Sequence, residues 1–219
     1  SEFSEGWCKG TNITNILIMP SNEKNIFYYD NKFIVGKSDP KSDVFDVLLY
    51  ARRNIKEALI PSFIKIIDSY AFENCTCLKK VEFTDDSQLK SIKVSAFENT
   101  SLISLSIPSS VIELQSNWCA NNRFLTDIKI LQSKEKNILY YDNKFIVGKS
   151  DPKSDVFDVL ILASRDIKEA LIPSFIKIIA PNAFNNCSQL TKVEFDSNSN
   201  LEIIGKNAFT NTSICQISI

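Results

Sequence analysis

The chain contains two nearly identical copies of one long segment. Residues 25–67 read NIFYYDNKFIVGKSDPKSDVFDVLLYARRNIKEALIPSFIKII and return 112 positions later, at 137–179, with five changes in 43 positions. The changed pairs are Phe27/Leu139, Leu49/Ile161, Tyr50/Leu162, Arg52/Ser164 and Asn54/Asp166. A duplication at a fixed offset is the signature of an architecture built from repeated units. The sequence therefore predicts two modules, approximately 4–112 and 113–219.

A shorter period runs inside each module, in the pattern apolar-x-x-apolar-x-apolar. The eight segments that fit it are Ile13/Ile16/Ile18, Ile55/Ala58/Ile60, Leu78/Val81/Phe83, Leu102/Leu105/Ile107, Leu125/Ile128/Ile130, Ile167/Ala170/Ile172, Leu190/Val193/Phe195 and Ile214/Ile217/Ile219. Successive segments lie 23 or 24 residues apart, except for two steps of 42. The basic unit is thus about 23 residues long, and an insertion of roughly 19 residues interrupts the period twice.

A period of 20 to 29 residues with one short strand per unit is typical of leucine-rich-repeat solenoids. Neighbouring strands stack about 4.8 Å apart and form a parallel sheet, and their inward apolar side chains form continuous ladders. We therefore expect one mainly β solenoid over residues 1–219, with a parallel concave sheet and short irregular or helical convex segments. Residues 1–3 are interpreted as the remnant of a cloning site.

The return path of each unit carries a second apolar ladder. After Ile60, a proline ends the strand, and Ile64, Ile67 and the pair Ala71-Phe72 follow at inward positions. Asn74-Cys75 then turns the chain toward the next strand. In two units a Trp-Cys pair, at 7–8 and 118–119, takes the place of the Ala-Phe pair.

Each insertion is predicted to form a β-hairpin, at about 22–44 in the first module and 134–156 in the second. Its two strand-like runs, 27–29 and 33–35 in the first copy, are joined by Asp30-Asn31, which tolerates the positive φ of a tight turn. The hairpin also carries tyrosines, which suit binding surfaces because they are rigid and amphipathic. Equally, the hairpin can cover the solenoid, with one tyrosine of each pair packed beneath it. The tyrosines are Tyr28, Tyr29, Tyr140 and Tyr141.

The full repeat, L-x-x-L-x-I-P-x-x-V-x-x-I-x-x-x-A-F-x-x-C, closely resembles the BspA-like leucine-rich-repeat family. Residues 101–118 and 171–187 carry the pattern best. The resemblance covers nearly the whole chain and departs from the family pattern at the two Trp-Cys units and at the insertions. It implies a surface protein of the kind found in mucosal bacteria and protist parasites, where adhesion is the usual proposal.

The residues that face outward from the predicted sheet are candidates for ligand contact. They form a row of mixed charge, which also suits a merely solvated sheet. The candidates are Glu57, Lys80, Glu82, Ser104, Ser106, Asp127, Lys129, Glu169, Lys192 and Glu194.

Composition argues against several other functions. With 25 Lys+Arg and 26 Asp+Glu, the formal net charge is −1, which provides no field for attracting nucleic acid. No run approaches the roughly 20 apolar residues of a membrane span, so we expect no membrane insertion by this chain. Histidine, the commonest metal ligand and general base, is absent. Glycine-rich phosphate loops are absent as well, and we predict no cofactor, no metal and no enzymatic activity.

The six cysteines are predicted to be free thiols. The equivalent residues Cys75 and Cys187 are separated by four units, roughly 19 Å at the strand spacing, which is far beyond disulfide reach. Five N-x-S/T sequons, at Asn12, Asn74, Asn99, Asn186 and Asn211, mostly coincide with the asparagines of the turns. A structural role therefore explains most of them, and we expect few to be glycosylated.

The sequence as a whole predicts a binding scaffold at a cell surface or in secreted form. Its partner would be a protein or glycan, such as a host-cell surface or matrix component. One alternative is a structural spacer whose ligand site lies elsewhere, and an enzyme is the third class. We also expect self-association, because the last predicted strand leaves an open C-terminal end that another copy can cover.

Overall fold

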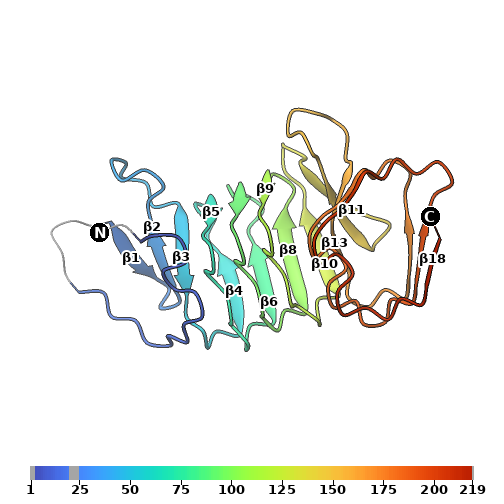
Figure 1. Cartoon of the computed structure of the whole chain (residues 1–219). Helices are drawn as coiled ribbons and strands as arrows, with labels where there is room; N and C mark the ends of the chain where they lie inside the picture. The colour runs from blue at the N-terminus through green and yellow to red at the C-terminus, as the bar shows by residue number, and fades with distance from the viewer. Residues whose placement is uncertain (1–2, 20–24, 219) are drawn as a thin grey trace.

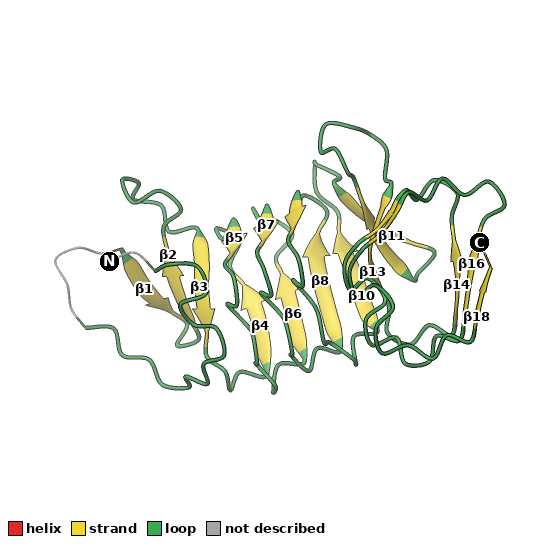
Figure 2. Cartoon of the chain, viewed as in Figure 1, coloured by secondary structure: helices red, strands yellow, loops and turns green. Residues whose placement is uncertain are grey.

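A computed structural model describes residues 3–19 and 25–218, and in this range the chain forms a β-solenoid without helices (Figures 1 and 2). One side of the solenoid, here called the long-strand face, carries parallel strands of three to five residues. One sheet has the order β10-β8-β6-β4 and crosses the module boundary, and the other has the order β14-β16-β18. The bounds are β4 Glu57–Ile60, β6 Lys80–Phe83, β8 Ser104–Pro108, β10 Asp127–Leu131, β14 Glu169–Ile172, β16 Lys192–Phe195 and β18 Gln216–Ser218.

The opposite side, here called the short-strand face, carries parallel strands of two residues. Each forms where the second apolar ladder was predicted, as Ile66 and Ile67 do in the first coil. The short strands are β5 Ile66–Ile67, β7 Ser91–Ile92, β9 Glu113–Leu114, β15 Ile178–Ile179 and β17 Ile203–Ile204. The predicted parallel solenoid is therefore confirmed, with a second sheet that the sequence did not reveal.

The return segments consist of turns. The prediction that some convex segments are helical is therefore wrong within the described residues. Each coil places two residues in the left-handed region four positions apart, such as Tyr70 with φ 62° and Asn74 with φ 59°. Residues with positive φ cannot continue a right-handed helix. The pairs recur at Gly6/Gly10, Ser95/Asn99, Asn117/Asn121, Asn182/Asn186 and Asn207/Asn211.

The turn asparagines bond to one another along the solenoid. The amide of Asn99 donates to the side-chain oxygen of Asn74 at 2.6 Å, and that of Asn211 donates to Asn186 at 3.0 Å. Four of the five sequons thus have an asparagine engaged in these turns. Their structural role accounts for the residue type without glycosylation.

The insertions are part of the short-strand face and do not project freely. Strands β1 and β2 form the predicted hairpin, with Asp30 and Asn31 both at φ 50°. A third strand, β3, pairs antiparallel with β2 and parallel with β5, so it joins the hairpin to the solenoid. The second module repeats this arrangement. The bounds are β1 Ile26–Tyr29, β2 Phe33–Gly36, β3 Val47–Ala51, β11 Ile138–Tyr141, β12 Phe145–Gly148 and β13 Val159–Ala163.

The first of the eight predicted strands is not formed. Residues 13–18 form no strand, and their contacts to the following chain are single hydrogen bonds, including the Arg53 N–H donating to the Ile13 carbonyl at 3.3 Å. A strand requires a ladder of such bonds. The other seven predicted segments all contain a long-strand-face strand. Ile219, the last residue of the eighth, lies outside the described residues.

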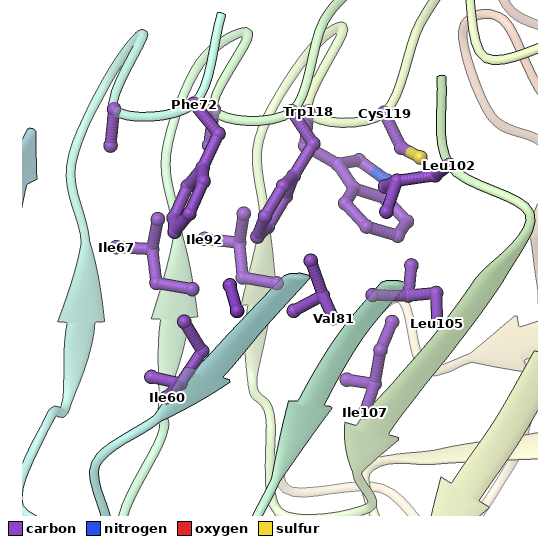
Figure 3. Close-up of a cluster of buried hydrophobic side chains, with 14 of the residues drawn as sticks. Ile60, Ile67, Phe72, Val81, Ile92, Leu102, Leu105, Ile107, Trp118 and Cys119 are labelled. Atoms are coloured by element: carbon purple, nitrogen blue, oxygen red, sulfur yellow. The ribbon is translucent and has the colours of Figure 1, made fainter. Parts of the chain in front are cut away.

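Apolar side chains from both faces meet in the solenoid interior (Figure 3). Phe72 is fully buried, stacks on Phe97 with ring centroids 4.7 Å apart, and meets Phe33 edge-on at 5.9 Å. Phe184 repeats the arrangement in the second module. Trp118 and Cys119 of the second module belong to the same cluster as Phe72, so one core continues across the boundary between modules.

One arginine is buried at each point where an insertion rejoins the solenoid, Arg53 in the first module and Arg165 in the second. Arg53 is 2% exposed, stacks on the Tyr50 ring at 4.2 Å, and donates to the carbonyls of Ala71 at 2.7 Å and Tyr70 at 3.1 Å. It also reaches the carbonyl of Thr11 at 3.3 Å. Its counterpart Arg165, also 2% exposed, donates to the Ala183 carbonyl, but its Nε and Nη2 have no partner among the described residues.

We predict that Phe72→Ala and Phe184→Ala each lower the free energy of unfolding by about 3 to 5 kcal/mol, because each empties a site between stacked coils. Chemical denaturation measures the change. Phe175→Ala is the control, since that ring is 37% exposed. A loss below about 1 kcal/mol at either buried site would contradict the stacking described here.

Replacing the buried arginines should separate their contributions. Arg53→Met leaves several buried carbonyls without a hydrogen-bond donor and is expected to lower the free energy of unfolding by about 3 kcal/mol. Arg165→Met should cost at least about 1 kcal/mol less, because it also removes two unpaired buried donors. Denaturation of the two variants under the same conditions tests this, and equal losses would be inconsistent with the observed hydrogen bonds.

Candidate binding surface

Several strands of the long-strand face, including β4, β6 and β14, expose alternate residues. In β4, Glu57 and Leu59 point to solvent while Ala58 and Ile60 are buried. The same alternation holds along β6. This pattern follows from the pleat, which directs successive side chains to opposite sides of a sheet. The positions predicted to face outward therefore lie on one surface within each sheet, with the exception described below.

The charged side chains of this face are paired with one another. Lys80 lies directly opposite Glu57 in the β4–β6 register, and its ammonium contacts the carboxylate of Glu82 at 2.9 Å. The hydrogen bond to Glu82 raises the pKa of Lys80 above its usual value. Farther along the sheet, the Ser104 hydroxyl donates to Asp127 at 2.8 Å, and Lys129 lies 3.7 Å from the same carboxylate.

Each module presents the same group of four side chains. The first patch consists of Glu57, Leu59, Lys80 and Glu82, and the second patch of Glu169, Leu171, Lys192 and Glu194. In both, a leucine that is more than half exposed lies among the charges, at 57% for Leu59 and 58% for Leu171. The ion pair is repeated too, since Lys192 contacts Glu194 at 2.8 Å, and this hydrogen bond raises the pKa of Lys192.

The predicted outward row is divided into two parts. Strands β10 and β14 belong to different sheets, because the second insertion separates them along the chain (Figure 2). The Arg165 N–H donates to the Leu125 carbonyl at 2.9 Å, a single contact where a continuous sheet has a ladder. The two patches are therefore separate surfaces.

Ser106 does not belong to this surface. Its side chain is 7% exposed, and its hydroxyl donates to the Val81 carbonyl at 3.4 Å. A serine is short enough to bond back to the neighbouring strand's backbone, which removes it from solvent. The prediction that Ser106 contacts a ligand directly is therefore corrected.

The tyrosines of the insertions are all partly buried. Tyr29 packs edge-on against Phe63 with ring centroids 5.6 Å apart, and Tyr141 packs the same way against Phe175 at 5.2 Å. The hydroxyls of Tyr28 and Tyr140 donate to hairpin carbonyls three residues ahead. Packing of the hairpin against the solenoid therefore explains both tyrosines of each pair, and neither pair forms a free aromatic surface.

The sequence did not indicate a cavity of about 220 Å³ at the junction of the modules. Leu114, Trp118 and Asn137 line it from one side, and Ile161 and Pro181 from the other. Val159 and Ile161 of β13 form part of its wall, and β13 was not predicted. Among the described residues, no three His, Cys, Asp or Glu side chains are grouped so as to hold a metal ion.

The sequence pattern of the BspA type leucine rich repeat region matches this chain in six copies, over residues 46–144 and 161–219. The chain belongs to this family. No curated protein matches the BspA-type chain closely enough to be counted as a relative.

Solved structures share the fold. One is a leucine rich cell surface protein from Faecalibacterium prausnitzii, with 23% identity, a TM-score of 0.65, and coverage of 75% of this chain and 41% of that one. Another is the pneumococcal vaccine antigen PcpA, at 26% identity, a TM-score of 0.64, and coverage of 80% and 42%. A leucine-rich repeat protein from Eubacterium ventriosum has 17% identity, a TM-score of 0.56, and coverage of 75% and 50%. The BspA-type chain thus spans half of these proteins or less.

In residues 3–19 and 25–218, no helix is long and apolar enough to cross a membrane.

The six cysteines differ sharply in accessibility, although all are unpaired. Cys8, Cys75, Cys119 and Cys187 are buried, and burial raises the pKa of Cys75 to about 11 and that of Cys119 to about 12. Burial also raises the pKa of Cys8 and Cys187. Cys77 and Cys215 are exposed.

We predict that two thiols react quickly with a thiol reagent in native buffer at about pH 8, because the attacking species is the exposed thiolate. All six should react after unfolding in denaturant. Substituting serine for both exposed cysteines should abolish the fast phase. Fewer than six thiols after unfolding without reductant would mean that disulfides form.

Proposed function

We propose that this chain is a binding scaffold of a secreted or cell-surface protein, and that its two repeated patches contact a protein ligand. The observation that carries the proposal is the repetition of an exposed leucine among paired charges, Leu59 in the first patch and Leu171 in the second. An apolar centre with a polar rim is the usual composition of a protein-binding surface. Family membership and the cell-surface description of one structural neighbour support the location.

Duplication of the patch supports a bivalent mode of binding. The residues are the same in both modules and lie on rigid strands, so each patch offers the same contacts. When a ligand surface is itself repetitive, engaging the second site is an intramolecular event, which multiplies affinity by about 10² or more. Matrix proteins and cell surfaces present such repeated ligands. Adhesion is therefore the role that this arrangement suits best.

Charge pairing favours a protein over a simple glycan as the ligand. The lysines of both patches already contact glutamates. The exposed leucines offer apolar area, which contributes about 25 cal/mol for each Å² removed from water. Glycan recognition would instead depend on aromatic platforms, and the insertion tyrosines are packed against the solenoid.

A catalytic role has less support in the structure. The junction cavity is lined mainly by apolar side chains, with Lys149 as its one charged residue. An apolar cavity of about 270 Å³ beside Tyr141 and Phe157 contains no carboxylate or thiol. Catalysis needs paired titratable groups within a pocket. We therefore propose that this chain is not an enzyme.

Binding of the purified chain to immobilised fibronectin, laminin and collagen, and to epithelial cell monolayers, tests the proposal. Leu59→Asp and Leu171→Asp should each weaken binding to a repetitive surface at least tenfold, through loss of bivalency. The double variant should lose it entirely. On a soluble monomeric ligand, either single variant should halve the number of sites and leave the affinity of the other unchanged.

The insertion loops offer a matched control. Val44 and Val156 are equivalent residues that are 49% and 52% exposed, so Val44→Asp and Val156→Asp introduce the same charge outside the patches. These variants should bind like the parent chain. Equal binding by all variants would identify a spacer, and losses confined to the control pair would place the ligand on the insertions.

A further inference from the structure

Four aromatic rings form a row along the first insertion. Phe27 lies inside this row, with its ring centroid 5.0 Å from that of Phe45 and 6.2 Å from that of Tyr29. Tyr29 in turn meets Phe63 at 5.6 Å. All three contacts are edge-on, an arrangement that aromatic pairs prefer. The Phe27 ring thus joins the loop after β2 to the tyrosine of the hairpin.

The second insertion has the same row without this ring. A leucine, Leu139, takes its position. The other rings keep their places, since Tyr141 packs edge-on against Phe175 at 5.2 Å. The Lys149 ammonium lies 5.1 Å from the Phe157 ring, and the matching lysine of the first module lies 5.0 Å from its ring. The frame around the missing ring is therefore preserved.

An apolar cavity of about 270 Å³ lies within this frame. Five of its six lining residues are identical to their counterparts in the first module, and Leu139 is the one that differs. The missing ring therefore distinguishes this site from the filled site of the first module. The lining residues are Leu139, Tyr141, Val147, Val156, Phe157 and Phe175.

The walls of the cavity fit an uncharged aromatic ring. None of the six lining side chains is charged, and the Tyr141 hydroxyl is the one polar group among them. A polar or charged group would lose its hydration here without gaining a partner. Apolar cavities of about 150 Å³ are large enough to bind benzene. A phenyl ring in this cavity could also repeat the edge-on contacts that Phe27 makes in the first module.

The cavity is open to solvent on one side, where Val156 is 52% exposed and Phe175 is 37% exposed. Sites for small molecules enclose most of the ligand and orient it through a few convergent polar groups. This cavity has neither property. Pockets that receive one aromatic side chain are instead typical of the energetic centres of protein interfaces. An aromatic side chain carried by a protein therefore suits the site better than a free small molecule.

We propose that this cavity receives the phenylalanine side chain of a protein partner, with its ring at the position that Phe27 occupies in the first module. The site belongs to the hairpin on the short-strand face, whereas Leu59 and Leu171 lie on the long-strand face. This inference therefore goes beyond the patches and does not depend on their ligand. The first module fills the equivalent site with its own ring, so each chain binds one such side chain.

Methyl NMR of the isotope-labelled chain with N-acetyl-phenylalanine amide tests the site directly. The signals of Leu139, Val147 and Val156 should shift and saturate, with a Kd on the order of 1 mM for so small a probe. N-acetyl-leucine amide is the matched probe without a ring and should bind at least about threefold more weakly. Absence of saturable shifts, or equal binding of the two probes, would overturn the proposal.

Exchanging one residue between the modules should move the site. Leu139→Phe fills the cavity with a ring of the chain itself and should abolish the shifts. Phe27→Leu should open the equivalent cavity and add a second site, observed at Val35 and Val44. The double variant should bind the probe in the first module alone. Each module then carries the residue that the other already has, and circular dichroism checks that the variants are folded. Binding that survives Leu139→Phe in a folded chain would contradict the proposal.

Peptide selection tests the class of partner. Phage-displayed random peptides selected on the parent chain, after depletion on the Leu139→Phe variant, should share a phenylalanine whose replacement by alanine abolishes binding. Enrichment of peptides without phenylalanine would overturn the assignment. Self-association that Phe124→Ser abolishes would do the same, because it would make Phe124 of a second copy, which is 49% exposed, the occupant.

Separate variants distinguish this site from the patches. Val156→Asp places a charge in the cavity and should abolish binding of the phenylalanine probe, whereas Leu59→Asp and Leu171→Asp should leave it unchanged. Leu139→Phe should in turn bind matrix proteins and cells like the parent chain. Loss of probe binding in the patch variants would contradict the independence of the cavity. Failure of the patch proposal alone would leave the probe titration unchanged.

Discussion

Every coil of this solenoid depends on the coil beside it to complete its hydrophobic core. A unit of about 23 residues contributes three apolar side chains from its long strand and a few more from its return path, which cannot enclose one another. Stacking joins them, as the contact between Phe72 and Phe97 shows. The parallel pairing of strands fixes the spacing at which the stacking occurs. The stability of the fold and the placement of its outward surface both follow from this dependence on neighbours.

The insertions are accommodated because they take the place of a neighbouring coil on the short-strand face. Strand β3 pairs with β5 as β5 pairs with β7, so the sheet continues into the hairpin without a gap. Between the modules both faces are interrupted, the long-strand face between β10 and β14 and the short-strand face between β9 and the sheet that begins with the second hairpin. Buried arginines occupy the interruptions. A guanidinium carries five donors in a fixed plane, which suits a place where several carbonyls lack strand partners.

The repeat made most of the fold predictable. A period of 23 residues located all seven long strands, since each follows directly from inward alternation, although it also predicted an eighth at residues 13–18 that does not form. Features set by contacts between distant residues were not accessible in this way. The apolar run of β3 gave no sign of its partners, and no sequence pattern marked Arg53 for burial. The outward row was largely located, except that Ser106 folds back on the Val81 carbonyl and the interruption at β14 divides the row in two.

The differences between the two copies of the duplicated segment also follow from their neighbours. Tyr50 and Arg52 reach back to the carbonyls of Ile13 at 2.9 Å and Thr14 at 2.7 Å. In the second copy, Leu162 at the position of Tyr50 belongs to the core cluster of the first module.

The first copy thus closes against a segment without strand partners, and polar side chains supply the hydrogen bonds that its carbonyls lack. The second copy closes against β10, whose ladder with β8 already satisfies part of the backbone, and there Leu162 packs in the core while Ser164, at the position of Arg52, still donates to the Thr126 carbonyl at 3.3 Å. At these positions, the two copies differ because the segments before them differ, whereas the patch residues on β4 and β14 face solvent in the same way and are identical.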